Sequence, residues 1–142
     1  MIYVGTSWKN AQWLDIVHKL LHSNDIETWD FRKLGFWWKD VEADSADPYN
    51  FLSAKASTDA FEYDKLGMDK MKMGLFLLPA GISTAIELGY MAGQGKPTVL
   101  WGQPRDRMDI MWNMAEVLLT PSRYNLEQAV DETVRVYREK FG

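Results

Sequence analysis

The fold is decided by residues 73–90, which read MGLFLLPAGISTAIELGY. The apolar run at the start, Met73 to Leu78, is typical of a strand that is buried on both faces of a parallel sheet. A turn of small residues, Pro79 to Gly81, follows, and the pattern then becomes helical. The segment therefore predicts a buried strand that passes through a tight turn into a helix, which is the repeating unit of open α/β sheets.

The same alternation of strands and helices extends over the rest of the chain. Further strands are expected at Ile2 to Gly5, Ile26 to Asp30, Thr98 to Trp101 and Val117 to Thr120. Further helices are expected at Asn10 to Ser23, from Asp47-Pro48 to about Asp69 with a break near Ser57-Thr58, at Asp109 to Glu116 and at Asn125 to Lys140. We predict one domain over residues 1–142. Its fold class is α/β, a flavodoxin-like (Rossmann-like) three-layer sandwich with a five-stranded parallel sheet of order 2-1-3-4-5.

Two helix faces are predicted from periodicity. The apolar face of the first helix should contain Trp13, Ile16, Val17, Leu20 and Leu21. This leaves His18 and His22 facing water, so their metal-ligand spacing of four does not predict a metal site. In the helix after Gly81, the face toward the sheet should contain Ala85, Leu88, Gly89 and Ala92, with Glu87 pointing away from the core, to a cleft or a partner subunit.

Composition excludes several classes of function. The chain has 142 residues, a net charge of −4 and no basic block, which argues against duplex nucleic acid as a partner. It has no cysteine, so disulfides and thiolate metal sites are excluded. No apolar run reaches the roughly 18 residues of a membrane helix, and Met1 to Gly5 does not resemble a signal peptide. We therefore expect a cytoplasmic protein, and we expect no cofactor.

Glu87 is the first candidate for chemistry. It follows a buried strand, near the start of a helix, where open α/β sheets bind their ligands. The helix dipole should keep its carboxylate ionised, and an ionised carboxylate in a cleft can attack an electrophilic sugar carbon. The alternative is a solvated glutamate that only stabilises the helix start.

The turns after the first and third strands should face one crevice, because those strands flank the switch point of this sheet order. Their backbone N–H groups and hydroxyls suit a 5′-phosphate, which we favour over a free nucleoside, and Lys9 could add positive charge. The alternative is that these hydroxyls only cap helices. The candidate substrate-binding residues in these turns are Gly5, Thr6, Ser7, Gly81, Ser83 and Thr84.

Two tryptophans are candidates for stacking on a base. Trp8 directly follows the first turn, and Trp37 lies in the aromatic stretch Phe31 to Asp47. Planar rings stack on nucleobases. The alternative is that these aromatic residues pack in a satellite core or an oligomer interface.

The chain resembles the nucleoside 2-deoxyribosyltransferases and their relatives, the 2′-deoxynucleoside 5′-monophosphate N-hydrolases. The residues that carry the resemblance are Ile2 to Gly5 with Ser7-Trp8, Asp64, Ser83 to Tyr90, and Gly95 to Pro97. The resemblance implies that Glu87 is the nucleophile, that Asp64 assists it near the sugar and base, and that Gly5 to Trp8 contact the substrate. Pro79, Gly81, Thr84 and Glu87 are also spaced as in the PGGxGTxxE motif of cytokinin-releasing phosphoribohydrolases.

Two further expectations come from this resemblance. The transferases carry an aspartate six residues before the nucleophile, and here that position is Gly81, which weakens the case for base exchange more than the case for hydrolysis. Met111, Trp112 and Asn113 lie where the transferases place residues that complete a neighbour's active site, so Asn113 is a further substrate-binding candidate. The resemblance therefore implies a homodimer or higher homo-oligomer.

The predicted function is cleavage of the N-glycosidic bond of a (deoxy)nucleoside or its 5′-monophosphate, with Glu87 as nucleophile and Asp64 as the acid. The base is released to water or exchanged. Asp64 has a plainer reading as a solvated helix charge. Two other functions stay open: a sensor that binds a nucleotide without cleaving it, and a flavodoxin-like redox protein, which fold class alone suggests.

Overall fold

A five-stranded parallel sheet forms the centre of the structure, a computed structural model that describes residues 1–34, 48–105 and 107–142. The strands are β1 (Ile2–Gly5), β2 (Thr28–Asp30), β3 (Met73–Leu78), β4 (Thr98–Gly102) and β5 (Val117–Leu119). Their order is β2-β1-β3-β4-β5 and all neighbours are parallel. The predicted flavodoxin-like α/β fold is confirmed, with β2 two residues shorter at its start than expected.

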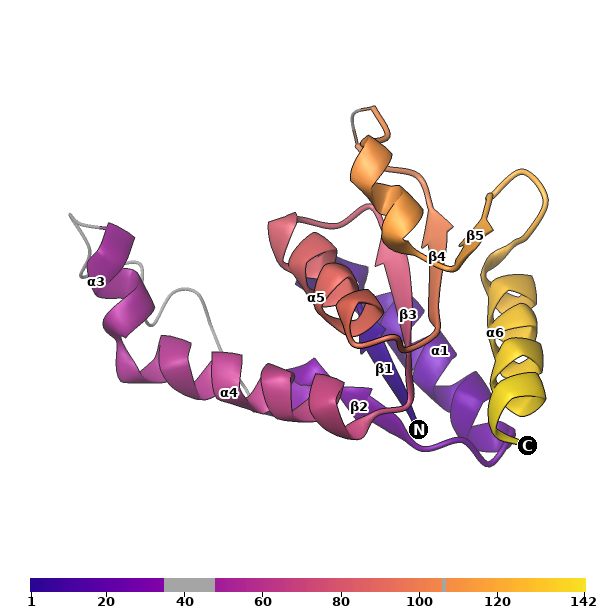
Figure 1. Ribbon diagram of the computed structural model, residues 1–142, viewed down its shortest axis with the longest axis horizontal. Helices are drawn as coiled ribbons and strands as arrows, with labels where there is room; N and C mark the ends of the chain where they lie inside the picture. The colour runs from indigo at the N-terminus through magenta and orange to yellow at the C-terminus, as the bar shows by residue number, and fades with distance from the viewer. Residues whose placement is uncertain (35–47, 106) are drawn as a thin grey trace.

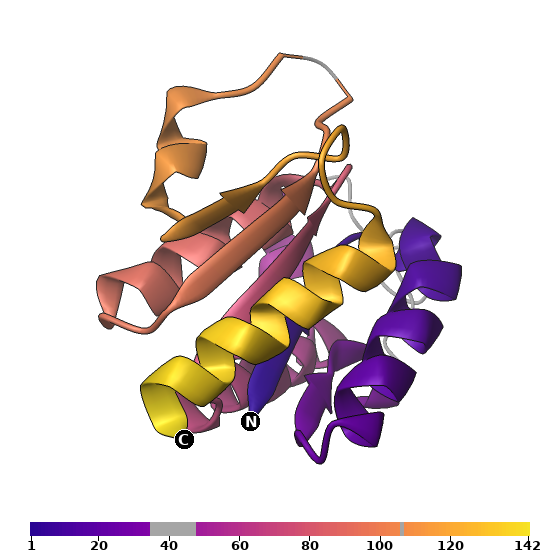
Figure 2. The ribbon, with the colours of Figure 1, turned by 90° about the vertical axis from the view of Figure 1, so that its right-hand side faces the viewer.

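Helices cover both faces of the sheet, as Figures 1 and 2 show. One face carries α1 (Ala11–Ser23) and α6 (Leu126–Phe141), and the other carries α4 (Lys55–Lys70), α5 (Ile82–Gly93) and the 3-10 helix η3 (Ile110–Met114). Two short 3-10 helices, η1 (Trp8–Asn10) and η2 (Phe31–Leu34), follow β1 and β2. In the described ranges no helix combines the length and the apolar character that a membrane span requires.

The core has two parts because side chains alternate across each strand. Ile2 and Val4 of β1 face α1 and α6, whereas Tyr3 faces α4 and α5. The six residues of β3 are all buried, as its apolar run predicts. The α4–α5 side of the core contains Tyr3, Met68, Met71, Phe76, Leu78, Leu88, Met91, Leu100 and Ala115.

The predicted face of the first helix is partly wrong. Leu14, Val17, His18 and Leu21 are the buried residues of α1, and Ile16 is 39% exposed. His18 is buried because β2 supplies polar partners: its Nδ1 lies 2.7 Å from Thr28 Oγ1 and its Nε2 lies 3.6 Å from Asp30 Oδ2. A histidine with such partners can enter a core that its polarity alone would forbid.

The predicted face of α5 is also partly wrong, since Leu88 is buried as expected but Ala85 is not. Thr84, Leu88 and Met91 pack on the sheet, whereas Ala85 is exposed. Leu88 and Met91 have more apolar surface to bury than Ala85 and Gly89, so the helix is rotated toward them. This rotation turns Glu87 toward Tyr3, into the layer between α5 and the sheet, and not away from the core.

The helical region before β3 is divided into two helices. These are α3 (Pro48–Ser53) and α4, and they meet at Ala54, whose φ of −61° and ψ of 140° are extended. The break therefore lies three residues before the expected Ser57-Thr58. The N-terminal part of α4, together with α3, extends past the sheet in Figure 1, while the C-terminal part packs on the core through Gly67 and Met68.

Candidate active site

Glu87 and Tyr3 form the centre of the candidate site. Glu87 is half-buried in the second turn of α5, and the hydroxyl of the fully buried Tyr3 donates a hydrogen bond to Glu87 Oε2. This bond joins the central strand β1 to α5. Tyr3 is not among the site residues predicted from the sequence, although one signal points to it: it is the one residue of the apolar run Ile2–Gly5 with a polar group at its tip.

Tyr3 acts only as a donor at this site. Burial raises the pKa of Tyr3 far above its usual range, and the carboxylates of Glu87 and Asp64 raise it further. The phenol therefore keeps its proton at any physiological pH. It occupies one oxygen of Glu87 and leaves the other oxygen available for a substrate.

Asp64 is the second carboxyl of the site, and α4 carries it. It is half-buried and makes no hydrogen bond or ion pair with any residue that the structure describes. Burial raises the pKa of Asp64 to about 7. An unpaired carboxyl that is largely removed from water costs stability, so Asp64 is a candidate for a functional group.

The helix dipole was expected to keep the carboxylate of Glu87 ionised. The structure does not bear this out. Burial raises the pKa of Glu87 to about 7, the charge of Asp64 raises it too, and the Tyr3 hydrogen bond opposes both. Desolvation outweighs the dipole here because Glu87 lies a full turn inside α5, where the dipole effect has declined. Because the two carboxyls repel each other when both are charged, loss of a proton by one favours retention by the other. Near neutral pH the pair can supply one carboxylate and one acid.

The turn after β1 is tied to the end of β3. The Thr6 hydroxyl donates to the Leu77 carbonyl oxygen at 2.8 Å, and Asn10 Nδ2 donates to Thr6 Oγ1 at 2.8 Å and to the Pro79 carbonyl oxygen at 2.9 Å. Thr6 is thus buried, and its hydroxyl links the turn to β3. Gly5 also has a packing role, because a Cβ there would lie 2.6 Å from the Phe76 ring.

Ser7 has the capping role that was the alternative to ligand binding. Its Oγ accepts a hydrogen bond from the Lys9 backbone N at 3.2 Å, at the start of η1. Its side chain is half-buried, whereas that of Lys9 is exposed. The Ser7 hydroxyl keeps its own proton for a ligand, since a hydroxyl both accepts and donates.

The start of α5 is open. Gly81 is the N-cap residue, no side chain in the described part of the chain caps this end, and a Cβ built on Gly81 would meet no described atom within 4 Å. Ser83 is exposed, so it is accessible, whereas Thr84 is 2% exposed and packs toward the sheet. The N–H groups of the first turn of α5 thus have no side-chain cap and lie beside an accessible serine.

Of the two tryptophans chosen for base stacking, the structure describes Trp8. Trp8 packs edge-on against Phe31, with ring centroids 5.1 Å apart, on the α1–α6 side of the core. Trp37 lies outside the described residues. Tyr63, which precedes Asp64 on α4, packs instead against Trp29 of β2, with ring centroids 4.8 Å apart.

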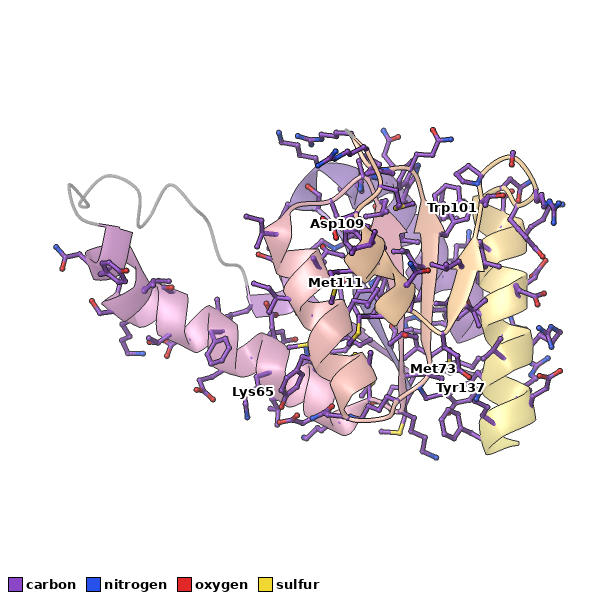
Figure 3. All side chains as sticks on the ribbon, turned by 45° about the horizontal axis from the view of Figure 1, so that its top comes forward. Lys65, Met73, Trp101, Asp109, Met111 and Tyr137 are labelled. Atoms are coloured by element: carbon purple, nitrogen blue, oxygen red, sulfur yellow. The ribbon has the colours of Figure 1, made fainter. Side chains whose placement is uncertain are left out.

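Asn113 is separated from Glu87 in this chain. Its Nδ2 donates to the Ile110 carbonyl oxygen at 3.0 Å, and its side chain is exposed. It lines a cavity of about 160 Å³ over β4 and β5, with Trp112 and Leu118, and Tyr3, Asp64 and Glu87 do not line that cavity. Figure 3 shows the neighbouring Asp109 and Met111 beside α5.

Comparison with known proteins shows a shared fold but no match to a protein family or a curated protein. No protein-family model and no curated protein matches this chain. Among solved structures, it is similar to a 2-deoxyribosyltransferase from the psychrotolerant bacterium Bacillus psychrosaccharolyticus, with a TM-score of 0.66, 13% sequence identity and 94% of each chain covered. The chain therefore has the fold of a 2-deoxyribosyltransferase over nearly its whole length.

Proposed function

We propose that this protein cleaves the N-glycosidic bond of a (deoxy)nucleoside or its 5′-monophosphate, with Glu87 as the nucleophile. The observation that carries the proposal is the buried group of Tyr3, Glu87 and Asp64, in which both carboxyls have pKa values raised to about 7. The shared fold supports a nucleoside as the substrate, since the similar solved structure is that of a 2-deoxyribosyltransferase.

In the first step the ionised Glu87 attacks the anomeric carbon through the oxygen that Tyr3 does not occupy. The bond from that carbon to the base nitrogen breaks, and its electron pair leaves with the base. Asp64, protonated near neutral pH, gives its proton to the departing base, which makes the base a better leaving group. The result is a glycosyl ester on Glu87, a free base and an ionised Asp64.

In the second step a water molecule or another base attacks the anomeric carbon of the ester. Asp64, now a carboxylate, accepts the proton that the attacking group loses, and Glu87 is released. Gly81 occupies the position of the second aspartate of the transferases, which favours water over a second base. Because a sugar without a 2-hydroxyl forms an oxocarbenium-like state more readily, deoxy substrates are the first choice.

The preference for a 5′-monophosphate stays a prediction, and fewer residues are now candidates to bind the phosphate. The start of α5 has uncapped N–H groups beside the accessible Ser83, and Ser7 keeps a proton to donate. Thr6 is already hydrogen-bonded to the backbone and Thr84 is buried, so we remove both from the set of phosphate ligands. The implied homo-oligomer also remains a prediction; in it, the exposed Asn113 would serve a neighbouring copy.

The proposal is tested by measuring free base after incubation with each deoxynucleoside and each deoxynucleoside 5′-monophosphate. Base release should be lost in Glu87→Gln and retained in Glu62→Gln, which changes an exposed glutamate on α4. A 2-fluorinated deoxynucleoside should leave a sugar adduct on Glu87, visible by mass spectrometry. No release from any substrate in the panel, or release that survives Glu87→Gln, would contradict the proposal.

A sensor that binds a nucleotide without cleaving it is the second candidate. Gly81, in the place of a catalytic aspartate of the transferases, is the feature that favours it. Nucleotide binding that is unchanged in Glu87→Gln, together with no base release by the wild type, is the result expected for a sensor.

A further inference from the structure

Helix α4 lies directly on the ring of Trp29 at one residue, Gly67. A Cβ built on Gly67 would lie 2.3 Å from Trp29 Nε1 and 2.4 Å from Trp29 Cδ1, closer than real side chains approach. Gly67 is buried within α4 and its φ is not positive, so the backbone conformation does not require glycine. The close approach of the helix to the ring is what requires it.

This contact has two costs in stability. Glycine within a helix is destabilising relative to alanine. Trp29 Nε1 is also buried with no hydrogen-bond partner among the residues that the structure describes, and a buried donor without an acceptor is destabilising. A larger residue at position 67 over a smaller ring at position 29 would fill the same space without these costs. What Gly67 and Trp29 together determine is the distance between α4 and the sheet.

This distance sets the position of Asp64. Asp64 lies one turn before Gly67, and residues three apart on a helix share a face. Trp29 pairs with Tyr3 in the register of β2 and β1, and both side chains pack on the α4–α5 side of the core. A helix seated on Trp29 therefore holds Asp64 near the layer of Tyr3. In agreement, the charge of Asp64 raises the pKa of both Tyr3 and Glu87.

We propose that Trp29 and Gly67 are positioning residues, which hold Asp64 in the candidate site by setting how closely α4 lies on the sheet. The C-terminal end of α4 is fixed separately, because the Tyr90 hydroxyl of α5 donates to Asp69 Oδ1 at 2.6 Å. A change at the Gly67–Trp29 contact can thus move the turn that carries Asp64 without releasing the helix. The role of Asp64 as an acid rests on the proposed function, whereas its position does not.

The first test is the titration of the Asp64 carboxyl, followed by the NMR shift of its side-chain carboxyl carbon. Gly67→Ala should lift α4 from the ring and expose the carboxyl to water, so the pKa of Asp64 should fall from about 7 by at least about one pH unit, toward its ordinary value. In the background Trp29→Leu, where the added methyl group has room, Gly67→Ala should leave this pKa unchanged. A pKa that Gly67→Ala does not move in the wild-type background, or moves equally in both backgrounds, would overturn the proposal.

A second pair of variants tests the same contact from the side of the sheet, and it decides the matter where Gly67→Ala is too unstable to titrate. Trp29→Ala removes the ring on which α4 rests and introduces no clash, so water should reach Asp64 and its pKa should fall. Trp29→Phe keeps a ring beneath α4 and should keep the raised pKa. Equal pKa values of Asp64 in Trp29→Ala and Trp29→Phe would also overturn the proposal.

The third test measures base release against pH and rests on the proposed function. Because Asp64 must be protonated to act as the acid, Gly67→Ala should move the basic limb of the kcat profile to lower pH by as much as the pKa of Asp64 falls, with KM little changed. Val17→Ala is the control: it leaves a void in the core on the α1 side of the sheet, and should lower stability but leave the limb in place. No base release by the wild type would contradict the proposed function, and the titration of Asp64 would still decide the positioning role.

Discussion

Tyr3 and Glu87 are 84 positions apart in the chain, yet the Tyr3 hydroxyl donates a hydrogen bond to Glu87 Oε2. Tyr3 lies in the first strand of the sheet, and Glu87 lies on the helix that follows the third strand. The bond therefore depends on the parallel pairing of β1 with β3, which brings the two elements side by side. It holds one carboxylate oxygen in a fixed place and lowers the pKa of a carboxyl that burial raises.

Tyr3→Phe should raise the pKa of Glu87 further above its ordinary value, because the hydrogen bond that lowers it is lost while burial remains. A smaller fraction of Glu87 is then ionised at neutral pH, so the acid limb of the rate profile for base release should move to higher pH. The lost hydrogen bond should also lower the free energy of unfolding by about 1 kcal/mol. The measurement is the pH dependence of base release.

Tyr137→Phe is the control for this change. It removes the hydroxyl of α6 that accepts from the Met1 amino group at 2.9 Å, on the other side of the sheet from α5, and should leave the acid limb in place. An acid limb that is identical in the wild type and Tyr3→Phe would show that Tyr3 does not tune Glu87.

Stability should fall as the pH rises from about 4 to about 7, because of the two carboxyls. Asp64 and Glu87 have folded pKa values raised to about 7, above the ordinary values that they regain on unfolding. The folded protein therefore binds more protons than the unfolded chain in that window, and deprotonation favours unfolding. Asp64→Asn removes one of these groups and should raise the free energy of unfolding at pH 8 by at least about 1 kcal/mol, with little change near pH 4.

Chemical denaturation at the two pH values measures this difference. Asp59→Asn is the control, because Asp59 lies on the same helix and makes an exposed ion pair with Lys55. A stabilisation by Asp64→Asn that is equal at pH 4 and pH 8 would contradict the assignment of a raised pKa.

Gly67→Ala should be strongly destabilising because Gly67 lets α4 lie directly on Trp29. A Cβ at this position would come within 2.3 Å of Trp29 Nε1 and 2.4 Å of Trp29 Cδ1. The ring is also held by Tyr63, so it cannot simply move aside. We expect a loss of about 2–3 kcal/mol in the free energy of unfolding. In the background Trp29→Leu the added methyl group has room, and the loss should be much smaller; additive effects of the two changes would contradict this packing.

The strand order could be predicted because it follows from the alternation of strands and helices along the chain. Apolar runs and turns of small residues mark that alternation in the sequence. Residues 73–90 already contain the strand, the turn and the helix that carries Glu87. The rotation of each helix was harder to predict. On α5 the choice between Ala85 and Met91 as the buried residue depends on how much space the opposite side of the core offers, and that space is set by residues far away in the chain.

The candidate site could be predicted only in part, because some of its features are local in the sequence and others depend on distant residues. Glu87 could be found from its local motif, and Asp64 only through a resemblance, because nothing near it in the sequence marks it. Tyr3 could not be paired with Glu87 without the register of β1 and β3. The raised pKa of Glu87 was also beyond sequence reasoning, since burial of the carboxyl follows from the rotation of α5.

His18→Gln should reduce the loss of stability on acidification. Burial lowers the pKa of His18, despite the opposing charge of Asp30, so the unfolded chain takes up a proton at a higher pH than the folded protein does. The contribution of His18 is therefore present above about pH 6.5 and is lost as the pH falls below it, the opposite sign to that of the two carboxyls. The structural reason is that the Thr28 hydroxyl lies 2.7 Å from His18 Nδ1, and His18 Nε2 is buried without a hydrogen bond among the described residues.

The measurement is the difference in unfolding free energy between the wild type and His18→Gln, taken at pH 7 and at pH 5. The difference in unfolding free energy should be smaller at pH 5, because only the wild type has a buried neutral imidazole whose contribution to stability is lost on acidification. His22→Gln is the comparison: His22 Nε2 lies 2.8 Å from the same Thr28 hydroxyl, but its side chain is exposed, so that variant measures the loss of the contact with Thr28 without the loss of a buried ring. If His18→Gln gave equal differences at pH 7 and pH 5, His18 would titrate alike in the folded and unfolded chains, and its polar pocket against β2 would contribute nothing to the acid sensitivity of the fold.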